Sequence, residues 1–387
     1  MTDNRRDFLR KSASIATALS IGGINSALSN PITQSVEQTM GLNAMAKDAG
    51  MQMSNAYFSG MPANRQLIEL AKQMDALGAI AGIDMKLNPG MSEQPWEYNA
   101  IVGVREAWKK VGLNYNVVEG PPSLGEKTKL GLEGRDEEIA NFISFMKNLK
   151  RSGVDVICYN WMPVVSWART QMDRPGRGGA LMTAFDYDQI KDKPLTKYGD
   201  VSHEAMWKNL EYFLKAVVPE AEKIEMKLAL HPDDPQVPKI QGIPRIMNTV
   251  ENFDRMMKII PSDFNGVTMC QGNFSLMGTD IPALIRRWGK AGKIHFVHFR
   301  NVQDLSGVLP STKFTETFHD EGQIDMYAAM KAYYDIGFRG AIRPDHVPTM
   351  AGELNTAPGY MTLGNLFAIG YIRGLAEAVA KEGKRRN

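Results

Sequence analysis

Short apolar segments alternate with longer amphipathic ones along most of the chain, and this alternation restricts the fold more than any other feature of the sequence. The intervening stretches, such as RQLIELAKQMDAL and DMYAAMKAYYDIG, space their apolar residues by three and four, which is typical of helices with one buried face. Repeated strand and helix units of this kind form parallel sheets. The apolar segments that we interpret as strands lie near residues 51–58, 78–84, 114–120, 154–161, 226–232, 265–271, 293–300 and 340–345. Eight such units in one domain predict an α/β fold, a (β/α)8 TIM barrel.

The first 46 residues differ from the rest of the chain. The basic stretch NRRDFLRKS is followed by the mildly apolar run SIATALSIGGINSAL, which is the order of regions in an export leader. Arg5 and Arg6 are followed at the expected spacing by Phe8 and Leu9, and this pattern indicates a twin-arginine leader. The alternative is a membrane anchor that is retained.

A small-residue triplet, Ala-Met-Ala at 44–46, resembles a cleavage site. We therefore predict a twin-arginine-type signal peptide at 1–46, a single TIM-barrel catalytic domain at 47–387, and export to the periplasm by the twin-arginine machinery. No other segment reaches the ~18 apolar residues that a spanning helix needs. No stable membrane span is therefore expected after the leader is removed.

Charge and cysteine content narrow the classes of function. The chain has 45 Lys and Arg against 43 Asp and Glu, for a net charge of +2, and the two signs are interspersed. Because there is no basic stripe, no nucleic-acid partner is expected. Its two cysteines, Cys158 and Cys270, are too few for a disulfide framework. The sequence leaves open whether the chain forms a homo-oligomer.

Four side chains of metal-binding type follow one another on four successive predicted strands. They are His231 in LALHP, Cys270 in GVTMCQG, His298 in IHFVHFRN and Asp345 in AIRPDH, each at the carboxyl end of its strand. In a parallel barrel these ends open onto one face, so the four side chains are expected to converge. Taken singly, each is more often a hydrogen-bonded buried group or a small core residue than a metal ligand. Taken together they predict a metal site, whose mixed ligands do not choose between Zn, Fe(II), Mn and Co.

Other polar residues near these strand ends suit an anionic, hydroxyl-rich substrate. Arginine forks match carboxylates, and the alternative for each arginine is an ion pair at the barrel rim. The candidate substrate-binding residues are Arg300, Asn301, Arg343, Arg169 and Asn160.

The segment 162–202 is too long for an ordinary connection, and we interpret this insertion as a lid or substrate loop. Asp233 and Asp234, which lie between two prolines, fit a turn or a helix cap better than a ligand role.

Several long motifs resemble those of the mannonate dehydratases, over most of residues 80–380. They include KLGLEGRDEEIANF, VICYNWMPVVSWART, HPDDP, GIPRI, IRRWGKAGKIHFVHFRNV and DMYAAMKA followed by RPDH. The resemblance implies a β/α barrel with a divalent metal, Mn²⁺ or Fe²⁺, bound by His231, Cys270, His298 and Asp345. The implied reaction is that of a lyase of sugar-acid and glucuronate catabolism, which removes water from D-mannonate to give 2-dehydro-3-deoxy-D-gluconate.

This reaction needs a base for the C2 proton and an acid for the leaving hydroxyl. Our candidates are Tyr360 and His346, with the assignment of acid and base left open. Val347 and Pro348 depart from the Gly and second His with which the family commonly continues RPDH, and the segment MQMSNAYFSG lacks the aromatic and arginine pattern expected there. Cytoplasmic members of the family lack an export leader, so the substrate alternatives for an exported relative are another aldonate, a uronate-derived acid or a glycoside of one. The alternatives are a metal-dependent isomerase or epimerase of the xylose-isomerase-like barrels and a non-catalytic sugar-acid binding protein.

Overall fold

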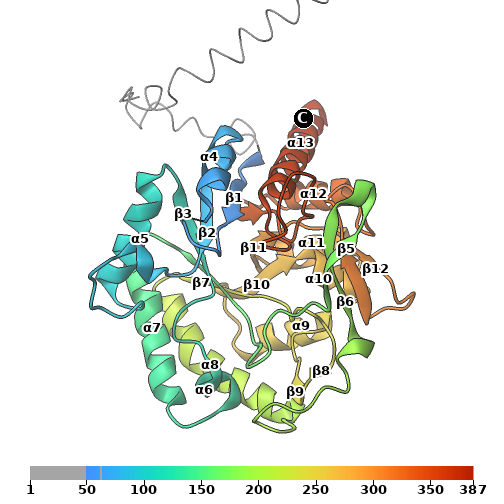
Figure 1. The fold of residues 1–387 in the computed structure, drawn as a ribbon. Helices are drawn as coiled ribbons and strands as arrows, with labels where there is room; N and C mark the ends of the chain where they lie inside the picture. The colour runs from blue at the N-terminus through green and yellow to red at the C-terminus, as the bar shows by residue number, and fades with distance from the viewer. Residues whose placement is uncertain (1–48, 62, 387) are drawn as a thin grey trace, which may run out of the picture. The chain divides into compact units, whose positions relative to one another are not determined.

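The computed structural model describes residues 49–61 and 63–386, so the predicted leader lies outside the described residues. Eight parallel strands close into a barrel in the order β1-β14-β11-β10-β7-β4-β3-β2 (Figure 1). Their bounds are β1 Gln52–Ala56, β2 Gly78–Ala81, β3 Asn114–Glu119, β4 Val156–Tyr159, β7 Lys227–Leu230, β10 Asn265–Cys270, β11 Ile294–His298 and β14 Ala341–Arg343. Each of these strands lies within one of the predicted segments, and the prediction of a TIM barrel is confirmed.

Helices connect the strands and surround the barrel (Figure 1). The α-helices are α4 Arg65–Gln73, α5 Tyr98–Lys110, α6 Glu126–Leu130, α7 Arg135–Arg151, α8 His203–Lys223, α9 Val250–Ile259, α10 Gln271–Leu276, α11 Ile281–Lys290, α12 Met326–Asp335 and α13 Thr362–Arg386. Short 3-10 turns lie at η1 Met85–Leu87, η2 Arg177–Gly179 and η3 Tyr187–Gln189. Several helices begin at a side chain that caps a free backbone N–H, as Ser202 does for Ala205 and Asp280 for Ala283. Local sequence thus fixes where these helices start.

The strands bury both of their faces, as expected for a parallel barrel. One face fills the barrel interior with a cluster of small and apolar side chains, namely Ile80, Val117, Cys158, Ala229, Phe296 and Ala341. The opposite face packs against the helices. Both cysteines are free and buried. Alternation along β11 leaves His295 and His298 on different faces, as the strand pattern predicts.

The insertion after β4 contains regular structure that the sequence did not reveal. Its strands β5 (Gln171–Pro175) and β6 (Leu181–Asp186) join β12 (Val302–Asp304) and β13 (Lys313–Glu316) in an antiparallel sheet of order β12-β13-β6-β5. A smaller pair, β8 (Lys239–Ile240) and β9 (Ile243–Pro244), follows β7. The insertion predicted as a lid or substrate loop therefore supplies two of the four strands of a second sheet. The other two strands come from the segment after β11.

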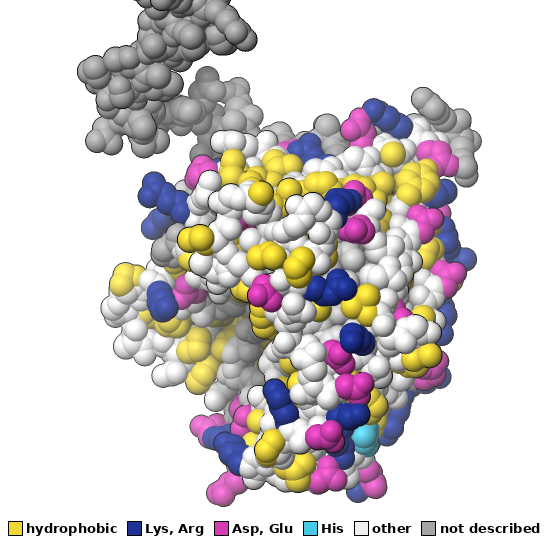
Figure 2. Space-filling model, turned by 45° about the vertical axis from the view of Figure 1, so that its right-hand side comes forward, with side chains coloured by type: hydrophobic (Ala, Val, Ile, Leu, Met, Phe, Trp, Pro, Cys, Tyr) yellow, Lys and Arg dark blue, Asp and Glu magenta, His cyan; other side chains and the backbone are white. Residues whose placement is uncertain are grey.

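The surface carries charges of both signs. Figure 2 shows acidic and basic side chains mixed over the visible face instead of gathered by sign. Within the described part of the chain, none of the helices is both long enough and apolar enough to span a membrane.

We expect acid to destabilise the fold partly through buried histidines. Burial lowers the pKa of His295 and His319 to about 4, whereas a histidine in an unfolded chain titrates near ~6.5. Between these values the unfolded state binds more protons, so the free energy of unfolding should fall as the pH drops from about 6.5 towards 4, by about 1.4 kcal/mol per unit of pKa difference. Urea unfolding across this range should show a shallower pH dependence for His319→Gln. The control His203→Gln removes an exposed imidazole and should leave the slope unchanged, and equal slopes for all three proteins would contradict the prediction.

Candidate metal centre and active site

The carboxyl ends of β7, β10 and β11 bring together His231, Cys270 and His298. One potential ligand atom from each lies within 4.8 Å of the others. Nε2 of His231 is 3.1 Å from Nδ1 of His298, and Cys270 pairs directly with His298 in the parallel register of β10 and β11. Three of the four predicted ligands therefore share one point at the end of the barrel.

Asp345, just after β14, completes the set. Its Oδ2 lies 3.5 Å from Nδ1 of His298 and 3.8 Å from Sγ of Cys270. Two imidazoles, a thiol and a carboxylate that converge in this way fit a divalent cation, because all four can present lone pairs to the same point. The structure thus brings the four predicted ligands together.

Arg300 determines the charge of Cys270. Its Nε lies 3.2 Å from the Cys270 sulfur, and both side chains are fully buried. Burial by itself would raise the pKa of the thiol, but the positive charge of Arg300 and hydrogen bonds from the two histidines lower it to about 5. Near neutral pH, Cys270 is consequently a thiolate, the form of cysteine that binds metals.

Glu119, the last residue of β3, is a member of the site that our sequence analysis missed. Its two carboxylate oxygens accept hydrogen bonds from Arg343 at 3.0 and 3.2 Å, and Oε1 is 3.4 Å from Nε2 of His298. Burial raises the pKa of Glu119, but Arg343 and His298 outweigh it and lower the value to about 2. The strand-end rule that located the other ligands could also have located this residue.

Arg343 was predicted to bind substrate, and the structure gives it protein partners. Besides Glu119, it donates to Oδ1 of Asp345 at 2.9 Å. Its positive charge helps to hold the pKa of Asp345 well below the ordinary value, against the effect of burial. Arg343 therefore keeps two carboxylates ionised at the edge of the metal site.

A buried charge cluster lies beside the metal site and consists of Arg169, Arg300, Asp234, Glu316 and His346. Both arginines donate to Oδ2 of Asp234 at 3.1 Å, and both bond to Oε1 of Glu316. Their side chains have no solvent exposure. The guanidinium groups predicted to bind a substrate carboxylate thus already face carboxylates of the protein.

The sequence analysis gave Asp234 a different role and did not identify Glu316. The prediction that the two aspartates cap a turn or the next helix was wrong for Asp234. The neighbouring Asp233 accepts from the backbone N–H of Met247 at 2.7 Å, which ties together two parts of the chain that lie 14 residues apart. Glu316 comes from β13 of the second sheet, which the sequence pattern did not reveal.

The two asparagines predicted to bind substrate are placed differently from each other. Asn160 lines the cavity beside the metal site, and its Oδ1 accepts from Nζ of Lys129 and from the backbone of Met162, both at 3.1 Å. Asn301 instead bonds to the backbone of Val302 and Ile324 at 3.0 to 3.1 Å. The Asn301 amide is therefore committed to holding a loop, and the structure does not bring it to the cavity.

A cavity of about 280 Å³ adjoins the metal site, and both acid and base candidates line it. The hydroxyl of Tyr360 donates to Oδ1 of Asp345 at 3.1 Å, and its ring centre is 5.3 Å from that of His346. Trp167 and Phe58 extend this row of rings at 5.4 Å on either side. The cavity thus has a metal-binding wall and an aromatic wall.

Burial and the charge of Asp345 raise the pKa of Tyr360 well above its ordinary value. The phenol therefore stays protonated and can act only as a proton donor in the resting site.

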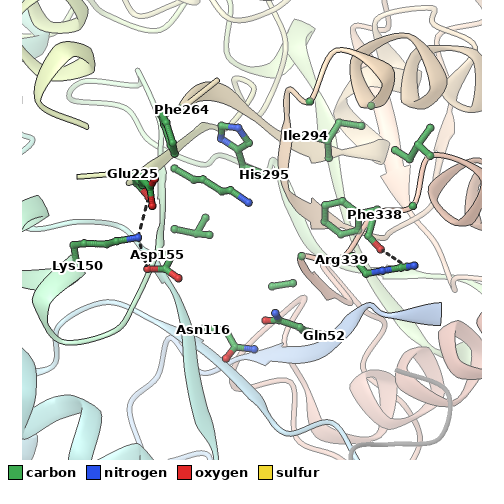
Figure 3. Close-up of a pocket in the computed structure, with 18 of the residues that line it drawn as sticks. Gln52, Asn116, Lys150, Asp155, Glu225, Phe264, Ile294, His295, Phe338 and Arg339 are labelled. Carbon is green, nitrogen blue, oxygen red and sulfur yellow. Dashed lines mark hydrogen bonds and ion pairs between the residues drawn. The ribbon is translucent and has the colours of Figure 1, made fainter. Parts of the chain in front are cut away.

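A larger cavity, of about 680 Å³, opens at the opposite end of the barrel (Figure 3). It is lined where strands begin, for example by Gln52, Lys227 and Ala341, and none of the predicted site residues that the structure describes belongs to it. His295 at its wall has both ring nitrogens against backbone carbonyls, those of Leu228 at 3.0 Å and Asp263 at 2.9 Å. The chemistry is therefore concentrated in the smaller cavity.

The chain is similar to known proteins over most of its length. The family model described as D-mannonate dehydratase (UxuA) matches residues 51–197 and 188–386. The mannonate dehydratase of Thermotoga maritima is 34% identical, over 82% of this chain and 95% of that protein. The mannonate dehydratase of Streptococcus suis serotype 2 has a solved structure that covers 86% of this chain and 96% of its own, with a TM-score of 0.77 and 30% identity. A xylose isomerase domain protein from Alicyclobacillus acidocaldarius, with a TM-score of 0.54 and 11% identity, shares the fold alone.

Substitution of a ligand should release the metal without unfolding the protein. We expect Cys270→Ser and His298→Ala to lose most bound divalent metal, measured by elemental analysis of the purified proteins, with circular dichroism as a check on folding. Cys158→Ser is the matched control, because Cys158 forms an alternative group with Glu119 and His298. If metal is retained in Cys270→Ser and lost in Cys158→Ser, the assignment is wrong and the group of Glu119, Cys158 and His298 is the metal site.

Proposed function

The chain belongs to the D-mannonate dehydratase family of hydro-lyases, and from this premise we propose that the cavity beside the metal site is where D-mannonate loses water to give 2-dehydro-3-deoxy-D-gluconate. One observation carries the proposal. Four ligand-type side chains from four strands converge beside a tyrosine and a histidine that line the same cavity. This combination supplies metal binding and proton transfer within a few ångströms, which the elimination requires.

His231, Cys270, His298 and Asp345 would hold the divalent cation, for which we propose Mn²⁺ or Fe²⁺. When bound, the cation would stabilise the negative charge that develops on the substrate as the C2 proton leaves. The donor set is compatible with both metals but does not choose between them and Zn or Co, so the choice of Mn²⁺ or Fe²⁺ rests on the resemblance to the family.

We assign the acid role to Tyr360 and the base role to His346. The raised pKa of Tyr360 supports its role as donor, since the phenol keeps its proton until the C3 hydroxyl leaves. His346 would accept the C2 proton at Nε2, the ring nitrogen that lies 3.8 Å from Oδ1 of Asp345. The C3–O bond then breaks, the hydroxide takes the Tyr360 proton to leave as water, and the electron pair from C2 forms the double bond to C3. The resulting enol loses the proton of its C2 hydroxyl and gains a proton at C3, which gives the 2-keto product.

The aromatic wall would keep bulk water from the reacting carbons. Phe58 and Trp167 flank the acid and base candidates, and both line the cavity. A drier site strengthens each electrostatic interaction within it.

The family reaction gives a direct assay. The protein from residue 47 onward, loaded with Mn²⁺ or Fe²⁺, should form a 2-keto-3-deoxy acid from D-mannonate, detected by a colorimetric test and confirmed by mass spectrometry. Tyr360→Phe removes only the hydroxyl and should lower kcat by about 100-fold, the scale of one general acid, with metal content unchanged. Product from another aldonate but not from mannonate would mean that the substrate differs, and would point to Val347 and Pro348 as the residues that changed specificity. No product from any aldonate, with metal bound, would contradict the proposed function.

We propose that residues 1–46 direct export of the folded enzyme to the periplasm by the twin-arginine route. The basic stretch, the paired arginines and the apolar run that follows support this localisation. A fluorescent protein fused behind residues 1–46 should accumulate in the periplasm of a bacterium with an intact twin-arginine system. The double substitution Arg5→Lys and Arg6→Lys keeps the charge and should abolish export, whereas unchanged export in this variant would contradict the assignment.

A further inference from the structure

Glu316 connects three separate parts of the chain beneath the cavity. It is the last residue of β13, and its side chain is only 2% exposed. A single oxygen, Oε1, bonds to Arg169 from the insertion after β4 and to Arg300 from the segment after β11, and lies 3.1 Å from Nδ1 of His346 after β14. Glu316 does not line the cavity, so any effect that it has on the reaction must pass through one of these neighbours.

His346 is held in a conformation that its own backbone does not favour. Its φ of 32° lies in the region that residues with a Cβ rarely adopt. The next residue, Val347, fixes the chain by donating its N–H to the carbonyl of Gly359 at 2.8 Å. Strain of this kind persists only where the surroundings impose it, and it often marks a functional position.

The ring of His346 is anchored through Nδ1. This nitrogen lies 2.9 Å from Arg300 Nη1, 3.1 Å from Glu316 Oε1 and 3.3 Å from Arg169 Nη2. A neutral imidazole carries one N–H, so Nε2 can accept a proton only in the tautomer whose Nδ1 carries the hydrogen, and Oε1 of Glu316 is the acceptor within reach of that hydrogen. Nε2 is therefore the nitrogen that remains for the cavity.

We infer that Glu316 is a positioning residue for the dehydration, which holds the His346 ring so that Nε2 faces the substrate. This inference rests on the proposed function, because it takes His346 to be the base. By accepting the Nδ1 hydrogen, Glu316 favours the tautomer in which Nε2 can take a proton, and its negative charge compensates the two guanidinium groups, which Asp234 alone would leave undercompensated in a buried site.

Three members of the buried charge cluster are also spaced as ligands of a cation would be. Ligand atoms of Asp234, Glu316 and His346 lie within 4.8 Å of one another. Both carboxylates, however, already pair with Arg169 and Arg300. Two guanidinium charges at this distance repel a metal ion. The geometry therefore favours a positioning role over a second metal site.

Glu316→Gln is the informative substitution, because it keeps the size of the side chain and one acceptor oxygen while it removes the charge. We expect kcat to fall by about 10- to 100-fold, with KM changed by less than about threefold and metal content unchanged, as for an interaction that matters mainly in the transition state. In a His346→Asn background the same substitution should cause no further loss of the residual activity. Glu204→Gln, at an exposed glutamate on α8 that pairs with Lys208 at 2.8 Å, is the matched control and should behave like the parent protein.

A second measurement reads the position of the ring without turnover. The ¹⁵N resonances of the His346 imidazole, assigned with His346→Asn in histidine-labelled protein loaded with Zn²⁺, should shift in Glu316→Gln and not in Glu204→Gln. Unchanged resonances, or an additive loss of kcat in the double variant, would overturn the inference. If the parent protein dehydrates no aldonate, the proposed function fails, while these resonances still decide whether Glu316 positions His346.

Discussion

Closure of the barrel between its first and last strands is the constraint on which the site depends. β1 pairs with β14 through only two residue pairs, Gln52 with Ala341 and Met53 with Ile342, and with β2 on its other side. Because β14 also pairs with β11, this closure holds β14 on both sides, and Asp345 comes two residues after the end of β14. If β14 were paired on one side only, Asp345 and His346 would be held less firmly relative to His231, which lies more than one hundred residues earlier in the chain.

The site that results is a balance of buried charges. Arg169, Arg300 and Arg343 face Glu119, Asp234, Glu316, Asp345 and the Cys270 thiolate, so the arginines alone leave two negative charges uncompensated. Despite burial, Glu119 and Asp345 raise the pKa of His298 well above its ordinary value, and a divalent cation would supply the missing charge in place of that proton. The arginines therefore serve less to attract substrate than to keep the acidic groups ionised in a site from which water is largely excluded.

The sequence predicted the barrel and the convergence of the candidate ligands for one physical reason. Periodicity locates strands, and parallel closure brings their carboxyl ends together, so His231, Cys270, His298 and Asp345 could be named in advance. Glu119 obeys the same rule and was missed only because we did not apply it to β3. Glu316 could not be found this way, since its place depends on the pairing of two distant insertions. Asn301 misled us because adjacency to a ligand in sequence does not determine where a side chain points after the strand has ended.

The distribution of the ligands along the chain has a consequence for assembly. The four candidate ligands lie at or just after the ends of β7, β10, β11 and β14, whereas the first half of the barrel contributes none of the four. A nascent chain that has made only its first four strands therefore has no site to load, and even a nearly finished one lacks Asp345. Metal retention would then act as a built-in test of completeness, because a molecule can hold its ion only after the whole polypeptide has been made and the ring has closed.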